Sequence, residues 1–73
     1  MHDTKGFIDR TAKAYLKLYK NASKADRLWV IRQHFEYINM VVEEQDRDWF
    51  FSQRGSYRSS LRWKIFIRFT NLV

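Results

Sequence analysis

Five basic residues recur along the first third of the chain at intervals of three and four positions: Arg10, Lys13, Lys17, Lys20 and Lys24. Residues spaced in this way lie on one side of an α-helix, so we call these side chains the basic row. At about 1.5 Å per residue the row is roughly 20 Å long, enough to follow a phosphate backbone. Because a lysine ammonium is a point charge that reads bases poorly, the row predicts binding to nucleic acid by charge. The alternative is a solvated face that only keeps the protein soluble.

Arginines alternate with aromatic residues in the last third of the chain. Arg54, Arg58 and Arg62 lie near Tyr57 and Trp63. Arginine pairs with phosphate through two N–H groups, and aromatic rings stack on unpaired bases. We therefore expect the three arginines to extend the nucleic-acid-binding surface. The alternatives are an ordinary exposed turn for Arg54 and Arg58 and a core position for Trp63, which its place in the pattern favours.

Residue types that carry catalysis or bind metals are scarce. The chain has no cysteine, its two histidines are His2 and His34, and its two glycines, Gly6 and Gly55, are isolated. It therefore lacks a thiolate nucleophile, a pair of histidines at zinc-binding spacing and a glycine-rich phosphate loop. We expect no catalytic, cofactor-binding or metal-binding residues, and a protein that is not an enzyme.

Charge is divided unevenly along the chain. The 14 basic and 8 acidic residues give a net +6. Residues 1–32 carry a net +5, residues 33–48 a net −4, and residues 49–73 a net +5 with no acidic residue. The basic ends indicate a polyanionic partner, which is either nucleic acid or an acidic protein.

Aromatic residues make up 18% of the chain, more than the core of so short a chain readily hides. The candidates for exposure are Trp29, Tyr37, Phe50 and Phe66. Exposed apolar surface is typical of protein-binding sites. The alternative function is therefore an adaptor or inhibitor that binds and modulates a larger protein through aromatic and basic surface, and a homodimer is compatible with either function. Binding to a membrane surface through residues 63–69 ranks last, because the charges of that segment do not segregate on a helical wheel.

Two helices are expected to position the basic row. Residues 4–20 place Ile8, Ala12 and Tyr15 on one side and the basic row on the other, the pattern of an amphipathic helix. Residues 24–47 form a second helix, because apolar residues repeat at intervals of three and four. This apolar stripe consists of Leu28, Ile31, Phe35, Ile38 and Val42.

The last segment follows a different period. From residue 61 to residue 70 every odd position is apolar, and Phe66 is the one large apolar residue at an even position. Alternation of this kind predicts a β-strand with one buried face. Its partner would be residues 48–53, paired through a turn that carries Arg54 and Arg58.

The expected fold is therefore α+β: one domain of residues 1–73, with two antiparallel helices followed by a C-terminal β-hairpin. An all-α three-helix bundle is the alternative. No apolar run is long enough to span a bilayer and no signal-peptide pattern is seen, so we expect a cytoplasmic protein.

Overall fold

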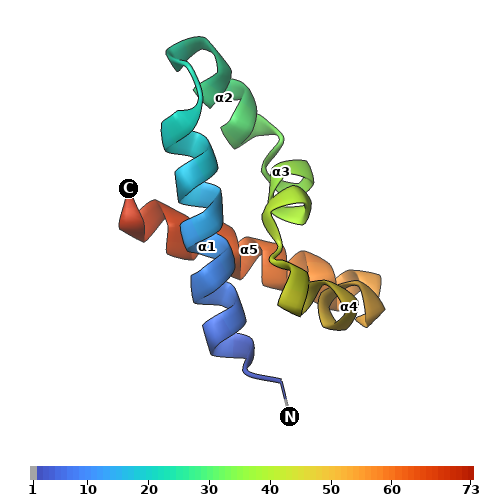
Figure 1. Cartoon of the computed structure of the whole chain (residues 1–73). Helices are drawn as coiled ribbons and strands as arrows, with labels where there is room; N and C mark the ends of the chain where they lie inside the picture. Colours follow the sequence, from blue (N-terminus) through green and yellow to red (C-terminus); the bar gives the residue numbers. More distant parts are fainter. Residues whose placement is uncertain (1) are drawn as a thin grey trace.

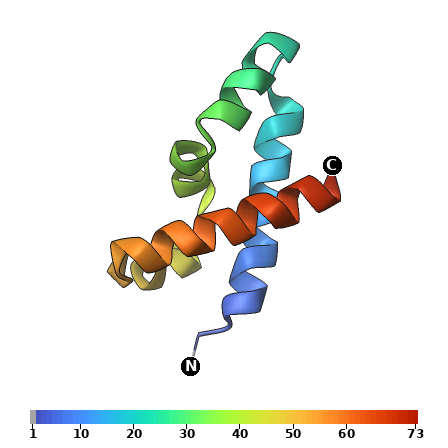
Figure 2. The same cartoon turned by 180° about the vertical axis from the view of Figure 1, so that it is seen from behind.

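Five α-helices account for almost all of residues 2–73, the part of the chain that the computed structural model describes (Figure 1). They are α1 (Thr4–Asn21), α2 (Lys24–Arg32), α3 (His34–Val41), α4 (Glu44–Ser52) and α5 (Gly55–Leu72). The chain runs along α1, returns beside it through α2 and α3, and turns aside in α4. The last helix, α5, then crosses α1, as both views show (Figures 1 and 2).

The first helix has the bounds that its sequence predicts. It begins after Asp3, whose carboxylate accepts a hydrogen bond from the backbone N–H of Gly6 at 3.0 Å. This side chain satisfies one of the N–H groups that have no partner within the helix. Ala12 and Tyr15 are fully buried, as predicted, whereas Ile8 is only partly buried and Phe7 takes the core position at the start of the helix. The prediction of a helix over residues 4–20 is confirmed, and its buried side is confirmed in part.

The single helix predicted for residues 24–47 is wrong, because the structure divides this segment into α2, α3 and the start of α4. The chain leaves the helical conformation at Gln33 and again at Val42 and Glu43. The second break is stabilised by Arg47, whose guanidinium donates to the backbone oxygens of Asn39 at 3.3 Å and Met40 at 2.9 Å. These carbonyls belong to the last turn of α3, where a helix has no internal donors.

The breaks also divide the predicted apolar stripe. Ile38 and Val42 are buried, whereas Leu28 is 57% exposed. The stripe therefore does not form one continuous buried face.

The predicted C-terminal β-hairpin is also wrong, and with it the α+β class, because residues 44–52 and 55–72 are helical. The odd positions of α5 form two separate rows spaced by four residues. Leu61, Ile65 and Phe69 are buried, while Trp63 is 52% and Ile67 55% exposed. Two such rows together fill every odd position and so imitate the alternation of a strand. The all-α alternative gave the right class, but the described residues form five helices and not three.

The core lies where α1, α3 and α5 meet. Its fully buried aromatic side chains are Phe7 and Tyr15 of α1 and Phe50 of α4, with Phe69 of α5 1% exposed. The rings of Tyr15 and Phe69 meet edge to face at 4.6 Å, and those of Phe7 and Phe50 lie 5.4 Å apart. The Tyr15 hydroxyl donates to the backbone oxygen of Val30 at 2.6 Å, which ties α2 to α1. Burial raises the pKa of Tyr15 well above its ordinary value.

Within residues 2–73, the structure contains no helix with the length and hydropathy needed to cross a membrane.

Candidate docking surface

The basic row is shorter in the structure than in the sequence. Lys24 begins α2 and so does not continue the helix that carries the other four residues. Arg10 turns to α4, where its Nε and Nη2 donate to the two carboxylate oxygens of Asp46 at 3.2 and 2.9 Å. Asp46 is 1% exposed. Arg10 therefore binds a buried carboxylate and joins two helices.

Asp46 keeps its charge in this buried position. Burial by itself would raise its pKa, but hydrogen bonds from Arg10 and His2 outweigh burial and hold the pKa below its ordinary value. The His2 Nε2 lies 3.1 Å from an Asp46 oxygen, and the imidazole stacks on Trp49 with ring centroids 3.8 Å apart. The first residues of the described chain are thus attached to α4.

The four lysines of the basic row differ in their surroundings. Lys13 forms an ion pair with Asp9 at 2.9 Å on the surface of α1. Lys17, Lys20 and Lys24 are exposed and form no ion pair within the described part of the chain. Lys17 and Lys20 lie in the second half of α1, and Lys24 is the first residue of α2.

The three C-terminal arginines have different surroundings. Arg54 is exposed directly before α5, and Arg58 donates to the backbone oxygen of Gln53. Arg62 donates to Asn39 Oδ1 at 2.8 Å. They do not lie on a hairpin, because residues 55–72 are helical.

Arg62 is packed between aromatic rings. Its guanidinium lies over the rings of Phe35 and Phe50, 5.3 and 5.4 Å from their centroids. Burial lowers the pKa of Arg62 from its ordinary value. This arginine therefore contributes to the packing of α3 and α4 against α5.

The four aromatic residues that were expected to be exposed differ in their exposure. Trp29 is 55% exposed, and Tyr37 and Phe66 are partly buried. Phe50 is fully buried against Phe7, so the expectation of an exposed Phe50 is wrong. Its position could not be read from the pattern, because it depends on α4 folding back toward α1.

The sequence pattern missed the outer face of α5. We define this face by four exposed residues at intervals of three and four: Ser60, Trp63, Lys64 and Ile67. Figure 2 shows α5 in front of the other helices. The expectation that Trp63 lies in the core is wrong, because the tryptophan belongs to the outer of the two apolar rows.

Trp63 also forms one wall of an open hollow beside the outer face. The hollow has a volume of about 380 Å³ and is lined by Arg32, Gln33, His34, Phe35, Glu36 and Trp63. It lies where α2 ends and α3 begins, beside α5. We call it the corner hollow.

The His34 ring in the corner hollow is fixed by its neighbours. The His34 Nδ1 lies 3.0 Å from the backbone oxygen of Ile31, and the ring stacks on Phe66 with centroids 4.4 Å apart. The ring of Trp63 lies 5.4 Å away. The hollow therefore has rigid aromatic walls.

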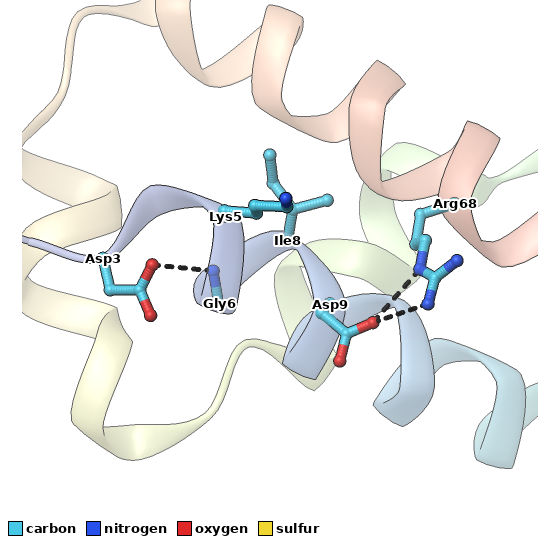
Figure 3. A pocket seen from close by; sticks show the side chains of 6 residues that line it. All are labelled: Asp3, Lys5, Gly6, Ile8, Asp9 and Arg68. Atoms are coloured by element: carbon cyan, nitrogen blue, oxygen red, sulfur yellow. Dashed lines mark hydrogen bonds and ion pairs between the residues drawn. The ribbon is translucent and has the colours of Figure 1, made fainter.

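A second hollow, of about 670 Å³, lies between the start of α1 and the end of α5 (Figure 3). Three of its four charged side chains already have partners, and Lys5 is the exception among the residues that line it. Asp3 caps α1, and Asp9 accepts hydrogen bonds from Arg68. Among residues 2–73, no group of three or more His, Cys, Asp or Glu side chains is placed to hold a metal ion. Neither hollow brings together an acid, a base and a nucleophile.

Comparisons with protein-family models, with curated proteins and with solved structures gave no match to this chain.

Proposed function

We propose that this protein is a non-enzymatic adaptor that binds an acidic protein partner through the outer face of α5. The observation that carries the proposal is the exposure of Trp63 and Ile67, 52% and 55%, one turn apart on a helix that already buries its opposite side. Large apolar side chains that gather on an uncovered face are typical of protein-binding sites, and tryptophan is enriched among their strongest contacts.

Burial of this face favours binding. Covering the exposed half of Trp63 would contribute about 2–3 kcal/mol and that of Ile67 about 1–2 kcal/mol, at about 25 cal/mol per Å². The helix is already folded against α1, so binding does not have to order the backbone first.

The charges around the outer face select the sign of the partner. Lys64 lies on the face and forms no ion pair within residues 2–73, and residues 49–73 contain no acidic residue. Complementary charge speeds association and disfavours partners of the same sign. An acidic surface fits this face, whereas a second copy would bring the same cations together.

The experiment compares two pairs of substitutions in capture of proteins from a nuclease-treated lysate of the source cells. Trp63→Ser with Ile67→Ser removes the outer row, and Leu28→Ser with Met40→Ser removes two exposed apolar residues of α2 and α3. An acidic protein retained by the wild type and by the control pair, and lost with the outer-row pair, is the expected result. Equal retention by both pairs would overturn the proposal.

Binding to nucleic acid is the second candidate, because Lys17, Lys20 and Lys24 are exposed and form no ion pair within residues 2–73. Three phosphate contacts on a duplex would give a slope of about −2.7 for log K against log salt concentration. The test titrates duplex DNA, single strands and RNA at several salt concentrations. Replacement of all three lysines by glutamate is expected to abolish binding, and unchanged binding at 100 mM salt would exclude this surface.

A further inference from the structure

We infer that the acidic partner presents an amphipathic helix to α5 and inserts one large apolar side chain of that helix into the corner hollow. This inference rests on the proposed function, because Trp63 belongs both to the outer face and to the wall of the hollow. It adds the form of the partner and the place where its main contact is made.

The corner hollow has the size and the lining of an anchor site. Its volume of about 380 Å³ lies near the lower end of the range for ligand pockets. The rings of His34 and Phe35 meet edge to face at 4.8 Å, and the ring of Trp63 lies 6.1 Å from Phe35. These rings would shield a single apolar side chain from water, which is the setting of strong interface contacts.

The backbone around the site favours a helical partner over an extended one. Residues 2–73 form no strand, so they offer no open sheet edge to which an extended peptide could add a strand. Helix α5 has its backbone groups hydrogen-bonded internally, so it offers side-chain ridges and grooves. The outer face has the spacing of such ridges, which pack into the grooves of a second helix.

The charges at the rim indicate carboxylates on the partner. Arg32 at the hollow and Lys64 on α5 are exposed and form no ion pair within residues 2–73, while Glu36 is the one acidic residue that lines the hollow. A helix with apolar residues on one side and glutamates along its edges would place opposite charges against two of these three groups.

The test uses synthetic helical peptides of defined sequence and the full chain labelled with 5-fluorotryptophan. The chain has three tryptophans, so the fluorine NMR spectrum reports each one separately once Trp29→Phe and Trp63→Phe have assigned the signals. The acidic probe has leucine and one tryptophan on one side and glutamate elsewhere. Matched peptides replace every glutamate by glutamine, or the tryptophan by alanine.

The acidic peptide is expected to shift the signal of Trp63 and to leave that of Trp49 in place. Both matched peptides are expected to bind at least tenfold more weakly. No shift with millimolar acidic peptide would overturn the inference, as would equal binding of the glutamine peptide.

Two substitutions separate the corner hollow from the outer face. Glu36→Trp fills the hollow and removes its one carboxylate. The loss of this negative charge alone would strengthen binding of the acidic peptide. The expected tenfold loss of affinity would therefore report that the hollow is filled. Glu36→Gln is the matched control and is expected to bind as well as the wild type or better. Ile67→Ser tests the outer face without touching the hollow.

A loss with Glu36→Trp alone keeps the hollow as the anchor site and excludes the outer face, provided that the far-UV circular dichroism of every variant matches the wild type. Weaker binding with both Glu36→Trp and Ile67→Ser supports the inference. A loss with Ile67→Ser alone keeps the proposed function and excludes the hollow as the anchor site. If neither variant loses affinity, both the inference and the proposed function are overturned. Tighter binding of a single-stranded oligonucleotide or of anionic phospholipid vesicles at Trp63 would assign the face to another class of partner.

Discussion

The two longest helices, α1 and α5, have 18 residues each and cross one another, yet they use their surfaces differently. Helix α1 has one apolar side and one charged side, and its polar groups hold other parts of the chain through Arg10 and Tyr15. Helix α5 has a buried apolar row and a second apolar row, Trp63 and Ile67, that remains about half exposed. The difference indicates that α1 uses its polar groups within the fold, whereas α5 packs with one side and leaves large apolar side chains exposed on the other.

The largest expected effect is on the free energy of unfolding, and it distinguishes the two apolar rows of α5. Ile65→Ala removes a fully buried side chain and is expected to lower the free energy of unfolding by about 2–5 kcal/mol. Ile67→Ala in the outer row is expected to change it by less than about 0.5 kcal/mol. Urea unfolding measures both, and a similar loss in the two variants would show that the outer row is also part of the core.

The next effect concerns the polar attachment of α4 to α1. Asp46→Asn removes the charge that Arg10 and His2 bind and is expected to cost about 1–3 kcal/mol at pH 7. The pKa of Asp46 in the folded protein lies below its ordinary 3.8. Its contribution is therefore complete above that value and is lost as the pH falls through the lower folded-state pKa.

The wild type and Asp46→Asn should thus approach the same stability in acid. Urea unfolding at pH 7 and at about pH 2.5 measures the two differences. Other carboxylates, such as Asp9, contribute equally to both proteins and cancel in the comparison. A difference that does not shrink in acid would contradict the role of the Asp46 charge.

A smaller effect tests the hydrogen bond between Tyr15 and Val30. Tyr15→Phe keeps the buried ring and removes the hydroxyl that donates at 2.6 Å. The expected cost is about 1 kcal/mol, because the backbone oxygen of Val30 loses a donor. Thermal unfolding followed by circular dichroism measures it, with Tyr57→Phe on exposed surface as the control. Equal melting temperatures would show that the hydroxyl contributes nothing.

The smallest effect compares the first turns of the two helices. Asp3 caps α1, whereas Arg54 stands at the same position of α5 without a side-chain hydrogen bond. Asp3→Ala is expected to cost about 1 kcal/mol, and Arg54→Asp to add about 0.5–1 kcal/mol by capping α5 and reversing the charge at its N-terminus. Urea unfolding gives both values, and destabilisation by Arg54→Asp would mean that the Arg54 side chain stabilises the fold in another way.

The same contrast explains what the sequence could predict. The bounds of α1 follow from its capping residue and its single apolar side, which are local properties. The breaks after α2 and α3 have no glycine or proline to mark them. The second break depends on Arg47, which reaches back seven and eight residues to the carbonyls of α3. Such a contact is visible only once the chain has folded.

The candidate site was predictable in part. Its basic character follows from the composition, because residues 49–73 carry five basic residues and no acidic one. The outer face of α5 was hidden because two rows spaced by four residues give the same alternation as a strand. Arg10 and Arg62 have the right residue type for binding phosphate, but Asp46 and two phenylalanine rings engage them, and these partners lie far away in the sequence.

The attachment of α4 through Asp46 has a consequence for how the protein opens. Short helices that few contacts hold detach at a lower free energy than the whole molecule unfolds. Backbone amides of α4 should therefore exchange with deuterium sooner than those of α1, and sooner still once acid neutralises the carboxylate. Release of α4 would expose the ring of Phe50 and the guanidinium of Arg62 that lies over it, so acid should increase the apolar surface that the molecule presents to solvent.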